Sequence, residues 1–154
     1  MRILSRPGAP SLRSVVSCAL LVVFVACARA ETETPSSDAD RLRALINETR
    51  AARGLAPLVA NPVLDASARE HSVKLARRQD LFHRSSREFR KLKVDWIRVG
   101  ENVGTAGDVD EMHRHMLASP LHRANVLGPF TDVGIGIERD KRNRLWITEL
   151  FVAQ

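Results

Sequence analysis

The chain has 154 residues, of which 24 are Lys or Arg and 18 are Asp or Glu, giving a formal net charge of +6. This length suits one domain. Residues 1–30 contain four arginines and no acidic residue, so the remainder is nearly balanced in charge. The basic composition is therefore not a sign of nucleic acid binding, and no nucleic acid partner is expected.

The first thirty residues have the pattern of a secretory signal peptide. Three arginines precede an apolar run over 15–28, and an Ala-Arg-Ala site ends at Ala30. The run is shorter than the roughly 20 apolar residues that span a bilayer. We therefore predict a signal peptide over 1–30 and an exported protein, either secreted to the extracellular space or periplasmic.

Both cysteines of the chain, Cys18 and Cys27, fall inside this segment. The exported domain is thus expected to fold without disulfides, by core packing alone. The sequence before Cys27 also resembles a bacterial lipoprotein cleavage site, so a lipoprotein anchored at Cys27 is the alternative location.

Residues 31–37 are polar and lack periodicity, which predicts a flexible leader before a domain over 38–154. A first helix is expected from Ser37 or Asp38 to just before Gly54. Asn61-Pro62 is a strong helix start, since an N-cap residue precedes a proline in the first turn. The second helix should bury one apolar stripe, made of Leu64, Ala68, His71 and Leu75.

The segment over 80–100 predicts irregular structure, with a short helix after Ser85-Ser86. Residues 69–98 hold ten Lys or Arg against four acidic residues, so positive charge is concentrated there. Such a stretch is usually a solvated face. Its functional alternative is contact with anionic envelope material, such as lipid headgroups or cell-wall polymers.

The rest of the chain predicts two short helices and a hairpin. Asp108 and Glu111 have the spacing of a helix N-cap, with a helix to about Ala118, and Pro120 opens a second turn that ends at Gly128. The segments over 132–139 and 145–154 alternate around a polar turn and predict a β-hairpin. Helices followed by a hairpin indicate an α+β fold, with helices packed around a small antiparallel sheet.

Three segments carry titratable residues among apolar or turn-forming neighbours: those around His83, Glu101 and His122. Two imidazoles suit zinc, and a carboxylate can orient an imidazole or accept a proton. The spacing does not force them together, and His122 alone could be a cation near a helix end. Glu101 is also expected to bind backbone N–H groups of a turn at Gly100.

The other histidines favour structural interpretations. His113 and His115 lie two apart on a helix and cannot chelate one ion together. His71, on the apolar stripe, is expected to be a buried and hydrogen-bonded core residue.

An ordered series of motifs resembles the CAP superfamily: cysteine-rich secretory proteins, antigen 5 and pathogenesis-related class 1 proteins. The resemblance covers about residues 38–152 and implies a three-layer α-β-α sandwich. The matching residues are Asn47-x-x-Arg50-x-x-x-Gly54-x-x-Pro57-Leu58, Asn61-x-x-Leu64-x-x-x-Ala68, Phe82-His83, Gly100-Glu101-Asn102-Val103, Ser119-Pro120-x-His122-Arg123-x-Asn125-Val126-Leu127, Gly134-x-Gly136 and Trp146 to Phe151.

The resemblance implies a cavity that is lined by two histidines and two acidic residues and can bind a divalent metal. His83, Glu101 and His122 match three of these positions. The fourth has no secure match, and Glu111 is the nearest acidic candidate; Asn102 and Arg123 are expected beside the cavity. Two residues depart from the family pattern, Leu121 for glycine and Met116 for tryptophan, and Leu121 is expected to narrow the cavity mouth.

Two functions follow as hypotheses. The first is a binding module in the cell envelope or extracellular space, holding a lipid, small molecule or envelope partner, with zinc as an optional ligand of His83 and His122. The alternative is a zinc-dependent hydrolase acting on peptide or cell-wall material, with Glu101 as general base. A structural envelope role is a third option, and the chain is expected to be a monomer.

Overall fold

The structure, a computed structural model, describes residues 37–154. The predicted signal peptide, Cys27 and most of the predicted leader therefore lie outside the described residues. Ser37, which was assigned to the leader, caps the first helix: its Oγ accepts the N–H of Asp40 at 3.2 Å. No helix in the described part is long and apolar enough to cross a membrane.

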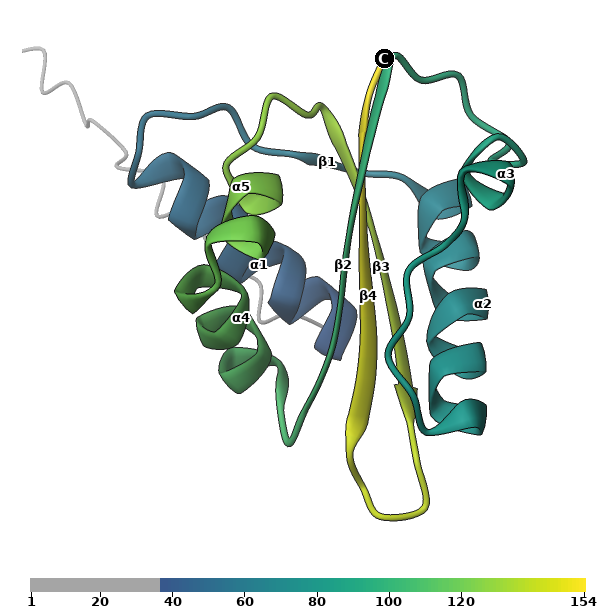
Figure 1. The fold of residues 1–154 in the computed structure, drawn as a ribbon. Helices are drawn as coiled ribbons and strands as arrows, with labels where there is room; N and C mark the ends of the chain where they lie inside the picture. Colours follow the sequence, from purple (N-terminus) through teal and green to yellow (C-terminus); the bar gives the residue numbers. More distant parts are fainter. Residues whose placement is uncertain (1–36) are drawn as a thin grey trace, which may run out of the picture. The chain divides into compact units, whose positions relative to one another are not determined.

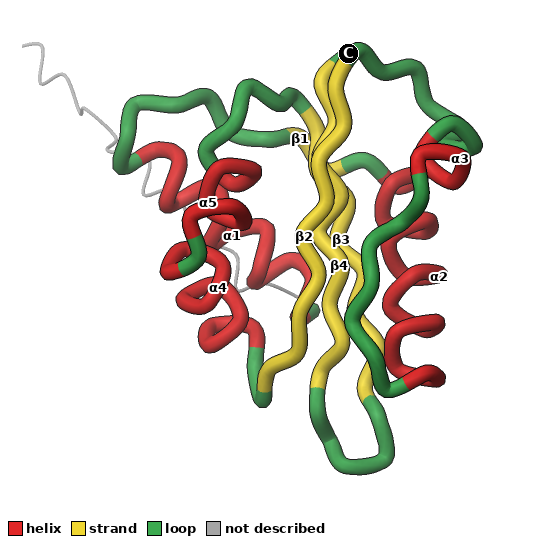
Figure 2. The backbone as a smooth tube through the Cα atoms, in the orientation of Figure 1, coloured by secondary structure: helices red, strands yellow, loops and turns green. Residues whose placement is uncertain are grey.

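Residues 37–154 form three layers, with a four-stranded sheet between two groups of helices (Figures 1 and 2). In chain order the elements are α1 (Asp38–Ala51), β1 (Val59–Ala60), α2 (Pro62–Arg78), α3 (Ser86–Phe89), β2 (Arg98–Ala106), α4 (Val109–Ala118), α5 (Pro120–Val126), β3 (Asp132–Arg139) and β4 (Leu145–Ala153). Helices α1, α4 and α5 lie on one side of the sheet, and α2 and α3 lie on the other (Figure 1). The predicted α-β-α sandwich is confirmed.

The strand order is β1-β3-β4-β2. The predicted hairpin is present as β3 and β4, which pair antiparallel from Asp132↔Val152 to Arg139↔Leu145. The sheet is mixed rather than purely antiparallel, because β1 pairs parallel to β3 over Val59 and Ala60. The predicted connector before Asn61 thus supplies a two-residue edge strand.

The helix starts follow the capping residues in the sequence. Asn61 accepts the N–H groups of Val63 and Leu64, and Pro62 occupies the first turn, where a missing N–H costs nothing. Ser85 and Glu88 form a capping box, and Asp108 accepts the N–H of Glu111 at 2.7 Å. Side chains that satisfy these otherwise free N–H groups fix where each helix begins.

The layer around α2 is packed closely against the sheet. All four residues of the predicted stripe are buried, together with Ser72, whose hydroxyl donates to the carbonyl of Gly136 at 2.9 Å. Gly134 and Gly136 face this helix, and a Cβ at either position would lie within 2.4 Å of helix atoms. Helix and strand can approach this closely only because these two positions lack side chains.

Two motif residues of α1 fasten the opposite layer through backbone groups. The side chain of Asn47 accepts the N–H of Leu58 at 2.8 Å and donates to its carbonyl at 3.0 Å. The buried Arg50 donates to the carbonyls of Ala56, Val126 and Gly128 at 2.8–2.9 Å. These contacts hold the connector and the end of α5 against α1.

The expectation of a turn at Gly100 is wrong. The segment from Gly100 to Val103 is not part of a turn; it lies within β2, which pairs with β4 along its whole length from Arg98 to Ala106. Glycine, glutamate and asparagine have low strand propensity, so the sequence of this segment does not predict a strand. The strand forms because it pairs fully with β4 and because four consecutive residues, from Glu101 to Gly104, are buried.

Candidate functional site

The candidate site lies at the free edge of the sheet, along β2. Successive residues of a strand point to opposite faces, so Glu101 and Asn102 face different helical layers. The side chain of Glu101 contacts the loop that follows α2, whereas that of Asn102 contacts α5. Strand β2 therefore connects the His83 segment on one side with the His122 segment on the other.

The carboxylate of Glu101 is fully occupied by its neighbours. One oxygen, Oε1, accepts the backbone N–H of Arg84 at 2.9 Å and lies 3.1 Å from Nδ1 of His83. The other, Oε2, is paired with the guanidinium of Arg84. The side chains of Glu101 and Arg84 are only 2% and 6% exposed, so this is a buried ion pair. Glu101 thus binds the backbone N–H of Arg84 and not a turn at Gly100, which corrects the sequence-based expectation.

Arg84 also connects the loop to α2. Its second guanidinium nitrogen donates to the carbonyl of Ser67. Arg84 therefore holds the segment that carries His83 against both the strand and the helix.

His71 lies beneath this cluster as predicted, buried and hydrogen-bonded. Its Nε2 donates to the carbonyl of Phe82 at 2.9 Å and lies 4.0 Å from Oε1 of Glu101. Burial lowers the pKa of His71, and its Nδ1 is buried without a hydrogen-bond partner among the described residues. His71 is therefore a neutral core residue that supports the loop.

His83 and His122 are the accessible members of the cluster. The side chain of His83 is 57% exposed, and its Nδ1 must carry the proton shared with Glu101, because an ionised carboxylate only accepts. His122 is half-buried. Burial lowers the pKa of His122, and the charge of nearby His83 lowers it further. The structure therefore brings the two imidazoles into electrostatic range of each other.

A network of amides positions His122. The Nδ2 of Asn102 donates to the backbone carbonyl of His122 at 3.2 Å, and its Oδ1 accepts from Asn125 at 2.8 Å. Asn125 also lies 3.3 Å from the carbonyl of Glu101. These bonds attach α5 to β2 through the side chains of both asparagines.

Three other predicted site residues have different contacts. Glu111 accepts the N–H of Gly107 at 2.7 Å and lies 3.9 Å from His115, so its described contacts are at the start and side of α4. Arg123 donates to the carbonyl of Leu117 at 2.8 Å, at the end of α4. Leu121 is 82% exposed and points to solvent, so it does not narrow the site.

Sequence reasoning missed two charged residues, Arg84 and Glu149. Arg84 had no distinguishing signal, because it is one of many cations in its segment. Glu149 did have one: it is the lone charged residue in a strand whose other members, apart from Thr148, are apolar. It is fully buried opposite Asn102, which donates to its Oε2 at 2.8 Å, while Oε1 has no partner among the described residues. Burial raises the pKa of Glu149 to about 7.

This shifted pKa predicts that stability falls as the pH rises. The carboxyl binds a proton more tightly in the folded protein, with a pKa of about 7, than in the unfolded chain near 4.5. The carboxyl of Glu149 therefore contributes its full stabilisation below pH 4.5. About 3 kcal/mol of the free energy of unfolding is lost as the pH rises from 4.5 to 7. Glu149→Gln, which mimics the neutral acid, should lose this dependence and be the more stable protein at pH 8. Urea unfolding at pH 5, 6, 7 and 8 measures this pH dependence, with Glu111→Gln as the control. If the free energy of unfolding changed with pH equally in the parent and in E149Q, the raised pKa of Glu149 would be contradicted.

The residues of the cluster do not fit a resident zinc centre. Zinc sites in proteins take three or four protein ligands. Within residues 37–154, no three His, Cys, Asp or Glu side chains are grouped so that they could hold a metal ion. His83 and His122 offer two imidazoles, and Glu101 is held by Arg84 instead of being free to bind a cation.

Fold and site together define a class: an α-β-α sandwich with a histidine from each helical layer at the free edge of its sheet. Residues 43–153 match the Cysteine-rich secretory protein family, CAP, and the chain belongs to this family. No curated protein matches the chain significantly.

Solved structures agree on the fold. An outer surface protein of Borrelia burgdorferi superposes with a TM-score of 0.71 at 18% identity, covering 79% of this chain and 96% of the other. An extracellular SCP-domain protein of Bacillus anthracis gives 0.68 at 22%, covering 76% and 40% of the two chains. A cysteine-rich secretory protein of Staphylococcus aureus gives 0.65 at 24%, covering 80% and 40%. This chain thus spans less than half of the last two proteins.

Proposed function

We propose that this CAP domain is an exported binding module that works in the cell envelope or extracellular space. Two observations support the location: the sequence pattern of residues 1–30, and relatives described as outer surface and extracellular proteins. The ligand-binding edge is the surface around His83 and His122, where one histidine is exposed and the other half-buried.

The observation that favours binding over hydrolysis is the ion pair of Glu101. A general base must be free to accept a proton from a water molecule within hydrogen-bond reach. Here both carboxylate oxygens are engaged by Arg84, and the side chain is shielded from solvent. Glu101 acts instead as a positioning residue, which holds His83 in one tautomer and one orientation.

The surface suits a ligand with a polar group and an apolar part. His83 and His122 can exchange hydrogen bonds with the polar group, and each is close in sequence to an exposed leucine, Leu81 or Leu121. A lipid, a small molecule or an envelope component has this combination. A divalent ion would bind weakly, because the site offers two imidazoles and stable zinc sites use three or four protein ligands. Contact with anionic envelope material through residues 69–98 remains part of this proposal.

Zinc titration by calorimetry tests whether the two histidines form one site. We expect weak uptake by the parent protein that is lost in both His83→Ala and His122→Ala, because each variant removes half of the donor pair. Lys93→Ala, a change outside the cluster, is the control. Equal uptake by parent and histidine variants would show that the two imidazoles do not act together.

Turnover assays separate the two functions. If the domain is a binding module, parent and Glu101→Gln should show no hydrolysis of peptide or cell-wall substrates, with or without added zinc. Hydrolysis by the parent that disappears in E101Q while the fold is retained would favour the zinc-dependent hydrolase.

A further inference from the structure

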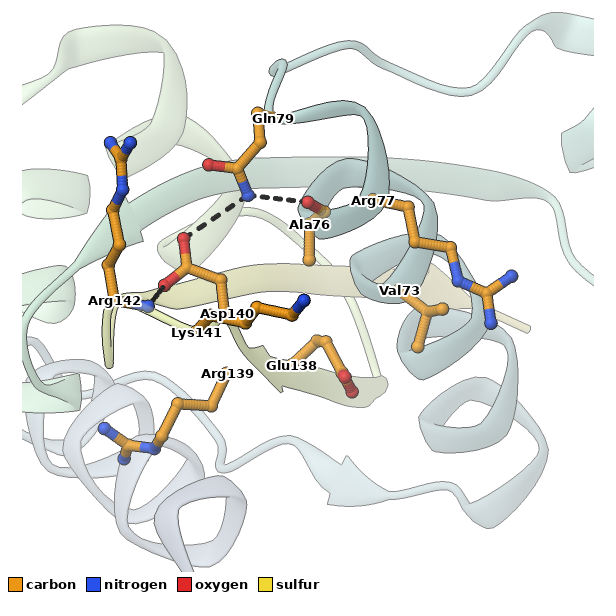
Figure 3. Close-up of a pocket in the computed structure, with 9 residues that line it drawn as sticks. All are labelled: Val73, Ala76, Arg77, Gln79, Glu138, Arg139, Asp140, Lys141 and Arg142. Atoms are coloured by element: carbon orange, nitrogen blue, oxygen red, sulfur yellow. Dashed lines mark hydrogen bonds between the residues drawn. The ribbon is translucent and has the colours of Figure 1, made fainter.

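A second candidate site lies between the C-terminal end of α2 and the turn that joins β3 to β4. Figure 3 shows the residues that line this pocket of about 630 Å³, in which the ammonium group of Lys141 points from the hairpin toward α2. Its lining comprises Val73, Ala76, Arg77, Gln79, Glu138, Arg139, Asp140, Lys141 and Arg142. None of these residues belongs to the His83–His122 edge, so the two sites can be tested separately. Because α2 contributes Arg77 from residues 69–98, the inference rests on the proposed contact of that segment with anionic envelope material and deepens it.

The walls of this pocket are fixed by Asp140. Its Oδ1 accepts the backbone N–H groups of Arg142 and Arg144 at 2.9 and 3.1 Å. Its Oδ2 accepts from Trp146 at 3.0 Å and lies 3.3 Å from Nε2 of Gln79 (Figure 3 shows the Gln79 contact). The bond from Trp146 is the main cause of a pKa for Asp140 that is far below the ordinary range. The carboxylate stays ionised and ties the turn to the end of α2.

Gln79 completes the connection between the two walls. It ends α2 in the left-handed conformation, and its amide donates to the carbonyl of Ala76 at 2.7 Å. Its Oε1 accepts from Arg144 at 3.0 Å. The pocket is therefore held in shape before any ligand binds, which lowers the entropic cost of binding.

Unpaired positive charge surrounds this space. Arg77, Lys141 and Arg142 have no ion-pair partner in the described part of the chain, whereas Arg139 is paired with Asp38 at 3.1 Å. Glu138 is the one lining acid without such a contact among residues 37–154. The lining thus holds three cations but one carboxylate without an ion pair. In Figure 3 the guanidinium groups of Arg77 and Arg142 point to opposite sides and the ammonium group of Lys141 lies between them, so Lys141 is the cation best placed to meet a bound anion.

The lining also has an apolar part and an extension. Val73 and Ala76 lie across from the side chains of Glu138 and Lys141 in Figure 3. An adjoining hollow along α2 shares Val73 and Arg77 and adds the cations Arg69 and Lys74. A compact anion with a short carbon chain matches the pocket, and further negative charge could follow the groove. A lysine ammonium group binds phosphate as a compact positive charge with three N–H donors.

We infer that the pocket between α2 and the β3–β4 turn binds a phosphate ester, with Lys141 as the recognising cation and with Arg142 and Arg77 adding positive charge on either side of it. The same phosphate chemistry occurs in a soluble organic phosphate and in the headgroup of an anionic lipid. Because the recognition is electrostatic and exposed, affinity should fall as the salt concentration rises.

Glycerol 3-phosphate is the probe, titrated into ¹⁵N-labelled protein with glycerol as the uncharged counterpart. We expect saturable shifts in the amides of Gln79, Lys141 and Arg142, and none with glycerol. In Lys141→Glu/Arg142→Glu the affinity should fall about tenfold or more, because two attractions become repulsions. The change should not unfold the chain, because both side chains are exposed and Asp140 contacts Arg142 through the backbone N–H, which the substitution keeps.

Arg53→Glu/Arg114→Glu is the matched control, since it changes the net charge equally at two exposed positions that lie outside the pocket and outside residues 69–98. An equal loss of affinity in both double variants would overturn the proposal in favour of general attraction to a basic protein. Absence of saturable shifts in the parent would overturn it as well. Co-sedimentation with phosphatidylglycerol vesicles identifies the source: vesicle binding lost only in K141E/R142E assigns a lipid headgroup, and phosphate binding without vesicle binding assigns a soluble ester.

Discussion

Gly136→Ala is expected to destabilise the domain by about 4 kcal/mol or more, enough to leave much of the protein unfolded at 37 °C. A Cβ at this position would lie 2.1 Å from the carbonyl carbon of Ala68 and 2.2 Å from the backbone nitrogen of Arg69. These atoms belong to the backbone of α2 and cannot rotate away. The helix would have to move away from β3, losing the packing of its buried stripe.

The control for this experiment is Gly107→Ala. A Cβ there would meet only the carboxylate oxygen of Glu111, at 3.2 Å, which is the far end of a flexible side chain. We expect a change of less than about 1 kcal/mol. Urea unfolding followed by circular dichroism measures both variants, and similar midpoints for G136A and the parent would show that α2 can move at little cost.

Arg84→Met should cost about 3 to 5 kcal/mol at neutral pH, because it leaves the buried carboxylate of Glu101 without its guanidinium partner. Burial of a charge without a partner is far more costly than the loss of an exposed pair. Arg84→Lys keeps the charge but not the second donor group that reaches Ser67, and it should therefore cost less than Arg84→Met. Chemical unfolding of the three proteins gives the comparison.

A double-mutant cycle shows whether the loss comes from the uncompensated charge. Glu101→Gln keeps an oxygen to accept the N–H of Arg84 but carries no charge. R84M/E101Q should therefore be more stable than R84M alone, with a coupling energy of at least about 1 kcal/mol between the two positions. Strict additivity would indicate that Arg84 contributes only packing.

The helices and the hairpin could be predicted because their signals are local. Ser37, Asn61 and Asp108 act within three residues of themselves, and alternation defines β3 and β4 without reference to the rest of the chain. Strand β2 could not be predicted in this way, because its Gly- and Asn-containing segment becomes a strand only when β4 lies beside it. Its burial is a property of the assembled sandwich.

The candidate site divides in the same manner. Motif order led to His83, Glu101 and His122, and the structure brings the first two into contact and the third into electrostatic range. Glu111 is suggested by its charge and by its place on the helix before His122. Its described contacts are with Gly107 and His115 instead, since the sequence does not encode which way its side chain points from α4. Arg84 was missed for a related reason: among many cations, the one that is buried is distinguished only by tertiary contacts.

The pairing of β1 with β3 has a consequence for aggregation. Strand β3 pairs with β4 on one edge, but on its other edge β1 covers only Asp132 and Val133, so from Gly134 onward that edge has no neighbouring strand among the described residues. Free strand edges invite a second chain to continue the sheet. Here the N–H of Ile135 is bound by the carboxylate of Asp65 at 2.7 Å, and Arg43 holds that carboxylate at 2.9 Å. The ion pair of Asp65 and Arg43 thus occupies the position where a strand of another molecule would pair with β3. It therefore protects this edge from aggregation at the high local concentrations that a protein meets while it folds.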